Sequence, residues 1–221
     1  MKTTQTIQEI DFFEELDENQ VELLASFSNV YKYPKKSILN YESDVNTNIL
    51  FLISGLIKIY KVDKFNNEIF LYHIHEKNMI SELSSIKQNS IYCFSNSEFM
   101  EDSVILSIDF EKFNEHFLSK NILTMKFMEE LLDKSHQLQC IINRELVFDA
   151  TAKVAFMLEN DLEMFNKLKR QEVSFMLHIQ PETLSRVLKR LKRNEIIDIV
   201  NSKIIILDKE QLSSIFRGVG I

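Results

Sequence analysis

The chain has 221 residues, of which 45% are hydrophobic and 27% charged, a composition that suits a folded protein of one large or two modest domains. No apolar run approaches the ~20 residues that cross a bilayer, and the first 13 residues are too polar and acidic for a secretory leader. Two cysteines, Cys93 and Cys140, are too few for a disulfide framework. We therefore expect a cytoplasmic protein that does not contact membranes.

The net charge of −7 is unevenly distributed along the chain. Residues 166–203 carry nine Lys or Arg against four Asp or Glu, a local charge of +5 that leaves −12 for the rest. Because nucleic-acid phosphates attract clustered cations, a basic segment in an acidic chain is typical of a nucleic-acid-binding domain. Nucleic acid is therefore the expected partner of this segment.

The first half of the chain predicts a short helical lead-in and then an antiparallel β-structure. Within residues 1–30, Asp17 suits a helix N-cap that precedes apolar residues at helical spacing. Short β-rich runs then alternate with polar turns, and the break at 63–67 between two such runs predicts a hairpin. The runs are 31–33, the two sides of Gly55 within 48–63, 68–74, 94–100 and 103–108. Many short strands at close spacing favour a small barrel or sandwich.

From about Glu111 the pattern predicts helix. Five positions alternate at spacings of 3 and 4, which is the pattern of a coiled-coil seam: Met128, Leu131, Ser135, Leu138 and Ile142. Further apolar residues widen this surface, so part of the helix is expected to pack on the preceding strands. The seam itself favours pairing with a second copy of the chain.

Two short helices joined by a tight turn are predicted at residues 173–193. Val173, Met176 and Leu177 share one helical face, a turn of about three residues follows, and Pro181 suits the first position of the next helix. At about 100° per residue, that second helix has an apolar side and an opposite polar side. The polar side carries Glu182, Ser185, Arg186, Lys189 and Arg193, and the apolar side carries Leu184, Val187, Leu188 and Leu191. This layout is typical of a helix-turn-helix that places its second helix in the DNA major groove.

A basic amphipathic helix alone is more often a solvated face or a surface for membranes or protein partners. Two features favour DNA here, because the helix is paired across a short turn and its polar face mixes Glu and Ser with Arg. Arg can bind guanine through two hydrogen bonds and Glu can accept one from cytosine, whereas a carboxylate does not help a phosphate or lipid contact. Beyond it, the runs Ile196–Val200 and Ile204–Leu207 around a polar turn predict a hairpin, the wing, and 209–216 predicts a last helix.

The stretch RQEVSFMLHIQPETLSRVLKRL, residues 170–191, resembles without gaps the helix-turn-helix of the Crp/Fnr family of bacterial transcription regulators. PETLSR is a frequent form of that family's recognition helix. His178 departs from the pattern, because such turns usually carry Gly, but His is among the residue types enriched at positive φ. The resemblance implies a homodimer that reads palindromic double-stranded DNA with TTGA-like half-sites and works with RNA polymerase.

The resemblance extends to the first half of the chain. ISGLIKIY (Ile53–Tyr60) is similar to a common string of the family's cyclic-nucleotide-binding β-roll, and Glu82 matches the acidic residue of its GEL motif. The expected fold class is therefore α+β: an N-terminal antiparallel, jelly-roll-like β-roll, a long dimerisation helix at about 111–147, and a C-terminal winged helix-turn-helix. Phe148–Ala155 is similar to the family's hinge, which predicts a sensor domain at 1–148 and a DNA-binding domain at 149–221.

The predicted roll departs from the family pattern where a cyclic nucleotide would bind. It contains Gly55 where the family carries several turn glycines, and Lys36 and Ser81 stand at two positions where Gly is expected. Tyr92-Cys93 occupies the place of the Arg-Ser pair that holds the cyclic phosphate. Without an Arg that donates two parallel hydrogen bonds, the phosphate loses its strongest charge-assisted contact. We therefore predict that cAMP is not the effector.

Iron–sulfur clusters and haem each require particular side chains as ligands. An iron–sulfur cluster requires about four cysteine ligands, more than this chain has, so none is expected. Haem stays open as an alternative, because one His can ligate it and His73 and His75 share a strand face, although structural histidines are the simpler explanation. A small ligand in the roll would meet Glu82, Tyr92 or Cys93, and Cys93 is either a sensor thiol or an inert buried one. No metal site is predicted.

The sequence thus predicts a DNA-binding transcription regulator. Glu182, Ser185 and Arg186 are expected to contact base edges. Phosphate contacts are expected from Arg170, Gln180, Thr183 and Lys189. The chain has no Gly-Lys phosphate loop, no Gly-x-Ser-x-Gly elbow and no HExxH sequence, so it is not expected to be an enzyme. The alternative is a haem- or small-ligand-sensing or interaction module with a degenerate DNA-binding domain.

Overall fold

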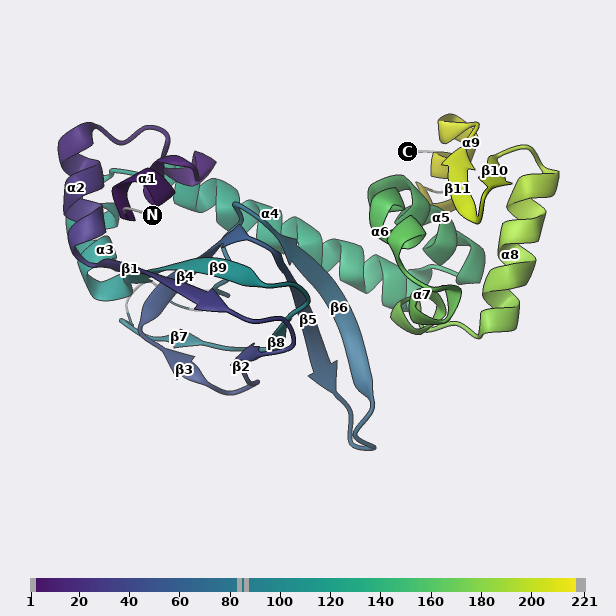
Figure 1. The fold of residues 1–221 in the computed structure, drawn as a ribbon, viewed down its shortest axis with the longest axis horizontal. Coiled ribbons are helices and arrows are strands. Elements are labelled where there is room, and N and C mark those ends of the chain that lie inside the picture. Colours follow the sequence, from purple (N-terminus) through teal and green to yellow (C-terminus); the bar gives the residue numbers. More distant parts are fainter. Residues whose placement is uncertain (1–2, 83–84, 86–87, 218–221) are drawn as a thin grey trace. The chain divides into compact units, whose positions relative to one another are not determined.

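A computed structural model describes residues 3–82, 85 and 88–217 (Figure 1). The contacts divide the chain into two compact units, one ending at His136 and the other beginning at Gln137. This division falls inside the long helix α4 (Thr124–Ile142), so the predicted domain boundary near Phe148–Asp149 stays a prediction. The expected α+β class, an antiparallel roll followed by a long helix and a winged helix-turn-helix, is confirmed. The long helix begins at Thr124 and not at about Glu111 as predicted, because a separate helix at Phe110–His116 and a 3-10 turn precede it.

Three short helical segments begin the first unit: α1 (Thr3–Gln8), a 3-10 turn at Asp11–Phe13 and α2 (Glu18–Ser26). Asp17 caps α2 as predicted, because its carboxylate accepts a hydrogen bond from the Gln20 amide at 2.8 Å while the Gln20 side chain accepts one from the Asp17 amide. The segments bring Phe12 and Phe13 against Phe51 of the roll, with ring centroids 5.1 and 5.0 Å away. The helical lead-in therefore covers one apolar surface of the roll.

The roll is built entirely from antiparallel pairs. Its nine strands are β1 (Ser28–Tyr33), β2 (Ile38–Asn40), β3 (Val45–Asn46), β4 (Asn48–Ser54), β5 (Leu56–Val62), β6 (Glu68–His75), β7 (Ile91–Tyr92), β8 (Asn96–Phe99) and β9 (Ser103–Asp109) in the described part of the chain. They form sheets in the orders β1-β9-β4, β2-β8-β5-β6 and β3-β7. The predicted hairpin is confirmed as β5–β6, whereas β2, β3 and β7 were not predicted because two or three residues carry no readable alternation.

Strand β4 explains how one roll supports two apolar clusters. Its side chains alternate, so Ile49 and Phe51 point into the cluster formed with the helical segments, and Leu50 and Leu52 point into the second cluster between the sheets. Both faces of β4 are buried, which explains why its sequence, NILFLIS, is an almost continuous apolar run. Helix α3 (Phe110–His116) and the 3-10 turn Leu118–Lys120 complete the first cluster before α4 begins.

Left-handed turns occur where the sequence lacks glycine. Lys36, at an expected glycine position, has φ 71°, and Asn66 of the β5–β6 hairpin has φ 66°, so both adopt the left-handed backbone that glycine favours. Ser81, the other residue at an expected glycine position, is not among the described residues with positive φ. Gly55 itself has φ 104°, and an added Cβ would overlap the Ser103 side chain. This glycine is therefore required by both its backbone and its neighbour.

The second unit contains a π-helical turn, five helices and a two-stranded sheet in the described residues. The elements are the π-helical turn Asn143–Val147, α5 (Ala150–Asn160), α6 (Leu162–Lys167), α7 (Arg170–Met176), α8 (Pro181–Arg193), β10 (Ile197–Val200), β11 (Lys203–Ile206) and α9 (Lys209–Arg217). In Figure 1, α7 and α8 follow one another across a short turn, and β10 and β11 form a hairpin beside α8. This is the predicted helix-turn-helix with its wing. Of the helices described, none is long and apolar enough to cross a membrane.

Candidate nucleic-acid interface and effector pocket

The turn between α7 and α8 adopts the backbone that the helix-turn-helix pattern requires. His178 has φ 52°, so this His accommodates the left-handed conformation, as expected. Around it, the Ile179 amide donates to the Ser174 carbonyl at 3.0 Å and closes the end of α7. Pro181 then begins α8 at its first position, where the missing N–H costs no hydrogen bond.

Helix α8 has two faces, as predicted from its sequence. The buried face packs on the second unit through Leu184, Val187, Leu188 and Leu191. The exposed face presents Glu182, Ser185, Arg186, Lys189 and Arg193. Gln180 is exposed at the N-cap, and Thr183 is half-buried next to it. The four apolar residues are thus buried, and the five polar residues of the predicted polar side are exposed.

The cations of α8 differ in what holds them. Arg186 donates through Nη2 to the Thr183 hydroxyl at 3.2 Å, an i, i+3 contact that orients its guanidinium along the exposed face. Arg190 bonds the Thr151 hydroxyl of α5, and Lys192 pairs with Asp198 of the wing at 2.7 Å. Within the described chain, Lys189 has no ion pair, so its charge stays available to an external anion.

Arg170, which was predicted to contact phosphate, packs against its own unit, whereas the polar residues of α8 are exposed. Its guanidinium lies 4.7 Å above the Phe165 ring, and Nη2 donates to the Ser202 carbonyl of the wing turn at 2.9 Å. Burial lowers the pKa of this arginine, and its Nη1 atom is covered without a hydrogen-bond partner in the described part of the structure. The guanidinium is engaged within its own unit.

A charged cluster that sequence reasoning missed lies at the turn of the helix-turn-helix. Glu145, from the π-helical turn, has Oε2 at 2.9 Å from His178 Nδ1 and 3.3 Å from Lys153 Nζ, and its Oε1 accepts from the neighbouring Arg144 at 2.7 Å. Partial burial would raise the pKa of Glu145, but hydrogen bonds from His178 and Arg144, with their charges, outweigh it and lower the pKa to about 2. No local sequence signal links these positions.

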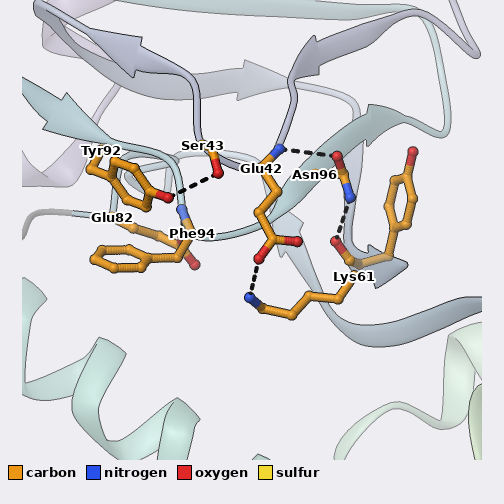
Figure 2. A network of polar contacts seen from close by, with 8 residues as sticks. Glu42, Ser43, Lys61, Glu82, Tyr92, Phe94 and Asn96 are labelled. Atoms are coloured by element: carbon orange, nitrogen blue, oxygen red, sulfur yellow. Dashed lines mark hydrogen bonds and ion pairs between the residues drawn. The ribbon is translucent and has the colours of Figure 1, made fainter. Parts of the chain in front are cut away.

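The roll contains a pocket at the place where the family resemblance puts its effector. It holds about 340 Å³ including its mouth, and the described residues that line it are Asn40, Asn46, Ile59, Ile80, Ser81, Glu82, Ile91, Cys93, Ser95 and Ser97. None of these carries a positive charge. Its one carboxylate, Glu82, accepts hydrogen bonds from the Tyr72 hydroxyl at 2.8 Å and from the Phe94 amide at 3.2 Å. Figure 2 shows Glu82 beside Phe94. Each carboxylate oxygen therefore already accepts one hydrogen bond from the chain itself.

Tyr92 and Cys93 do not supply the missing anion site. Tyr92 donates to the Ser43 hydroxyl at 2.9 Å and meets the Phe94 ring edge-on, at 5.0 Å between centroids (Figure 2). Cys93 is buried, and its pKa is raised to about 11, first by that burial and then by Asp44 and Glu82. A thiol with so high a pKa stays protonated at neutral pH, which favours the inert interpretation of Cys93 over the sensor one.

Two cations near this region, Lys61 and Lys134, are already engaged. Lys61 pairs with Glu42 at 2.6 Å (Figure 2). Lys134 of α4 donates to the Met79 carbonyl at 2.9 Å, and its burial lowers its pKa, partly opposed by the charges of Glu130 and Glu82. Neither side chain offers the planar, bidentate donor set that Arg gives to a phosphate.

His73 and His75 share a face of β6, as predicted, with ring centroids 6.3 Å apart. Burial lowers the pKa of His73 to about 4, aided by the neighbouring His75 and Lys58, so this imidazole is neutral at pH 7. Neither histidine lines the effector pocket. In the described residues no three His, Cys, Asp or Glu side chains gather as they would around a metal ion. The haem alternative stays a prediction.

Comparison with known proteins agrees with this architecture. A family model for the Crp-like helix-turn-helix domain matches residues 154–215. The chain is 20% identical over 196 residues to the cAMP-activated global transcriptional regulator CRP of Pasteurella multocida, which covers 84% of this chain and 93% of that protein. A CooA variant from Carboxydothermus hydrogenoformans superposes with a TM-score of 0.71 at 20% identity, over 93% of this chain and 94% of that one. FixK2 from Bradyrhizobium japonicum gives 0.64 at 15% identity, over 87% and 99%.

The chain combines a cyclic-nucleotide-binding-like roll, a long helix and a winged helix-turn-helix, which is the architecture of these solved regulators. Residues 154–215 match the Crp-like helix-turn-helix domain, and the chain has the fold of solved Crp/Fnr regulators. Residues whose importance the sequence did not indicate are Glu145 and Asn166, because each acts through a contact with a residue more than 30 positions away.

Proposed function

We propose that this protein is a sequence-specific DNA-binding transcription regulator that acts as a homodimer in the cytoplasm, together with RNA polymerase. Its target is a palindrome with TTGA-like half-sites, and its DNA binding does not depend on cyclic nucleotide. The observation that carries the proposal is the exposed face of α8, on which Glu182, Ser185 and Arg186 point away from a helix whose other face is buried.

The chemistry of that face assigns the contacts. Arg186 binds a guanine edge through its guanidinium, which Thr183 already orients, and Glu182 accepts from a cytosine amino group one helical turn earlier. Ser185 lies between them and accepts or donates. Gln180, Thr183 and Lys189 bind the flanking phosphates, which fixes the register of the helix without reading sequence.

The homodimer is supported by apolar side chains that α4 leaves exposed. Met128, Leu138 and Ile142 are 50, 56 and 46% exposed, and all three belong to the predicted seam. Leu131 is different, because it is half-buried against the first apolar cluster of the roll. Two helices that face each other along this seam would remove an apolar strip from water, and a dimer supplies two recognition helices for two half-sites.

Independence from cyclic nucleotide is supported by the pocket. A cyclic phosphate there would meet Glu82 and uncharged side chains, and the carboxylate that could bind a ribose hydroxyl is held by Tyr72 and the Phe94 amide. A buried anion without a cationic partner loses its hydration, and no charge-assisted hydrogen bond offsets that loss. The pocket therefore disfavours this ligand class electrostatically.

A binding experiment tests the proposal directly. Purified protein without added nucleotide would be mixed with fragmented genomic DNA, the retained fragments sequenced, and the enriched motif measured by fluorescence anisotropy against a scrambled duplex. We expect a palindromic motif bound at least ~10³-fold more tightly than the scrambled sequence, and no heat of binding in calorimetry with cAMP. Equal affinity for the motif and the scrambled duplex would reject DNA reading, and micromolar cAMP binding would reject the effector assignment.

A further inference from the structure

Strand β11 of the wing is hydrogen-bonded to a side chain of another element. Asn166, near the end of α6, donates through Nδ2 to the Ile204 carbonyl at 3.0 Å and accepts from the Ile204 amide through Oδ1 at 2.7 Å. The amide side chain therefore pairs with both backbone groups of one residue, as a neighbouring strand would. This contact fixes the distance of β11 from α6.

The turn of the wing is held by a second side chain, Arg170 of α7. Its Nη2 donates to the Ser202 carbonyl at 2.9 Å, and its guanidinium plane is supported 4.7 Å from the ring of the fully buried Phe165. Its Nη1 is covered by protein, so that nitrogen cannot reach a phosphate outside without moving the group. The Arg170 guanidinium therefore binds the wing turn rather than solvent.

The tip between these anchors has a defined shape. Asn201 and Ser202 have φ 50° and 66°, and Val200 pairs with Lys203 on either side of them. Two left-handed residues between paired strands form a tight hairpin turn. The exposed tip presents an amide, a hydroxyl and the Lys203 ammonium, which are the donors that bind DNA phosphates.

We infer that Asn166 and Arg170 are positioning residues that hold the wing as a second DNA contact, with the tip Asn201–Lys203 on the phosphate backbone beside the bases that α8 reads. The inference rests on the proposed DNA binding and replaces the direct phosphate contact expected of Arg170. An anchored tip contributes more to affinity than a mobile one, because less ordering is left to occur on binding.

The decisive comparison uses a neutral residue and a conservative cation. Asn166→Ala removes no charge, and we expect it to weaken binding to the motif about fivefold, as the loss of about one net hydrogen bond would. Arg170→Lys keeps the charge but loses the planar contact, so it should weaken binding as much as Arg170→Ala does. The double variant Asn166→Ala with Arg170→Ala should weaken binding by less than the product of the two single effects.

Footprinting locates the effect. Hydroxyl-radical protection should fall at the sugar-phosphates flanking each half-site in the Asn166→Ala complex and persist at the bases under α8. Asn160→Ala is the matched control and should keep both protections, because within the described residues its side chain donates to the Phe156 carbonyl on the same helix and forms no hydrogen bond with the wing. Lys203→Ala should lower the dependence of log K on log salt by about one, since it removes one cation from the tip.

The outcomes separate this inference from the proposed function. Wild-type affinity in Arg170→Lys together with unchanged flank protection in Asn166→Ala would overturn the inference while leaving DNA binding in place. A wild-type protein that protects no half-site would instead reject the function itself. Should Asn166→Ala fail to fold by circular dichroism, Asn166→Asp keeps the bond from the Ile204 amide and loses the other, and it must still reduce flank protection.

Discussion

The Glu145 carboxylate lies 2.9 Å from Nδ1 of His178, and this contact connects the π-helical turn that follows α4 to the turn of the helix-turn-helix. Because an ionised carboxylate can only accept, Nδ1 carries the proton in this pair. Lys153 and Arg144 contact the same carboxylate, so Glu145 gathers three cationic or polar donors. π-Helical turns are frequent at functional positions, and here one is joined to the residue with φ 52° that shapes the turn of the helix-turn-helix.

This cluster predicts an acid-dependent loss of stability. The pKa of Glu145 falls from the ordinary value of 4.5 to about 2 in the folded protein, so its contribution is complete above pH 4.5 and is lost as the pH falls from there towards 2. We expect Glu145→Gln to lower the melting temperature at pH 5–7 by about 2–8 °C, and the difference from wild type to shrink at lower pH. Carboxyl-carbon NMR should show Glu145 titrating near pH 2, and a midpoint near 4.5 would contradict the prediction.

Gly55 predicts a second stability effect, this time in the first unit. At φ 104° an L-residue is strained, and an added Cβ would also overlap the Ser103 side chain. We therefore expect Gly55→Ala to destabilise the roll by about 1–3 kcal/mol. Urea unfolding followed by circular dichroism measures this loss. Lys36→Gly is the matched control, since it relieves a left-handed residue at φ 71° and should not lower stability; a neutral Gly55→Ala would contradict the account.

The parts of this structure that follow from local rules were predictable. The division of α8 into a buried and an exposed face needs only the rotation per residue, and the cap at Asp17 needs only its neighbour Gln20. The replacement of a charged pair by Tyr92-Cys93 is visible only against the family pattern, so independence from cyclic nucleotide stays a prediction. The inferences on α8 and Asp17 depend on residues that are adjacent or one helical turn apart.

Contacts between distant positions could not be predicted in this way. His178 meets Glu145 across 33 positions, and Asn166 meets Ile204 across 38, and neither pair has complementary spacing or an unusual neighbourhood in the sequence. The same holds for the two groups that occupy Glu82, the Tyr72 hydroxyl and the Phe94 amide. Only folding brings such groups together, because their contact depends on the packing of whole elements.

The recognition face predicts two distinguishable losses of DNA affinity. Arg186→Ala should cost about 1–3 kcal/mol on the motif and relax specificity at one base pair, because it removes a base contact. Lys189→Ala should weaken all sequences alike and lower the salt slope by about one, because it removes a phosphate contact. Anisotropy titrations on motif and scrambled duplexes at several salt concentrations separate the two. Identical behaviour of the variants on both duplexes would show that these roles are wrongly assigned.

The exposed seam of α4 predicts how the oligomer would be broken. Leu138 is 56% exposed and belongs to the seam, so a charge there would be buried without a partner in a dimer, whereas it would remain solvated in a monomer. We expect Leu138→Glu to shift sedimentation velocity from dimer to monomer and to weaken binding to the full palindrome by at least ~100-fold, while the circular dichroism spectrum is retained. Glu129→Lys, an exposed position of the same helix outside the seam, is the control and should remain dimeric. A Leu138→Glu protein that sediments and binds like the wild type would place the dimer contact elsewhere, since a buried and unpaired carboxylate at a helix seam cannot be accommodated without cost.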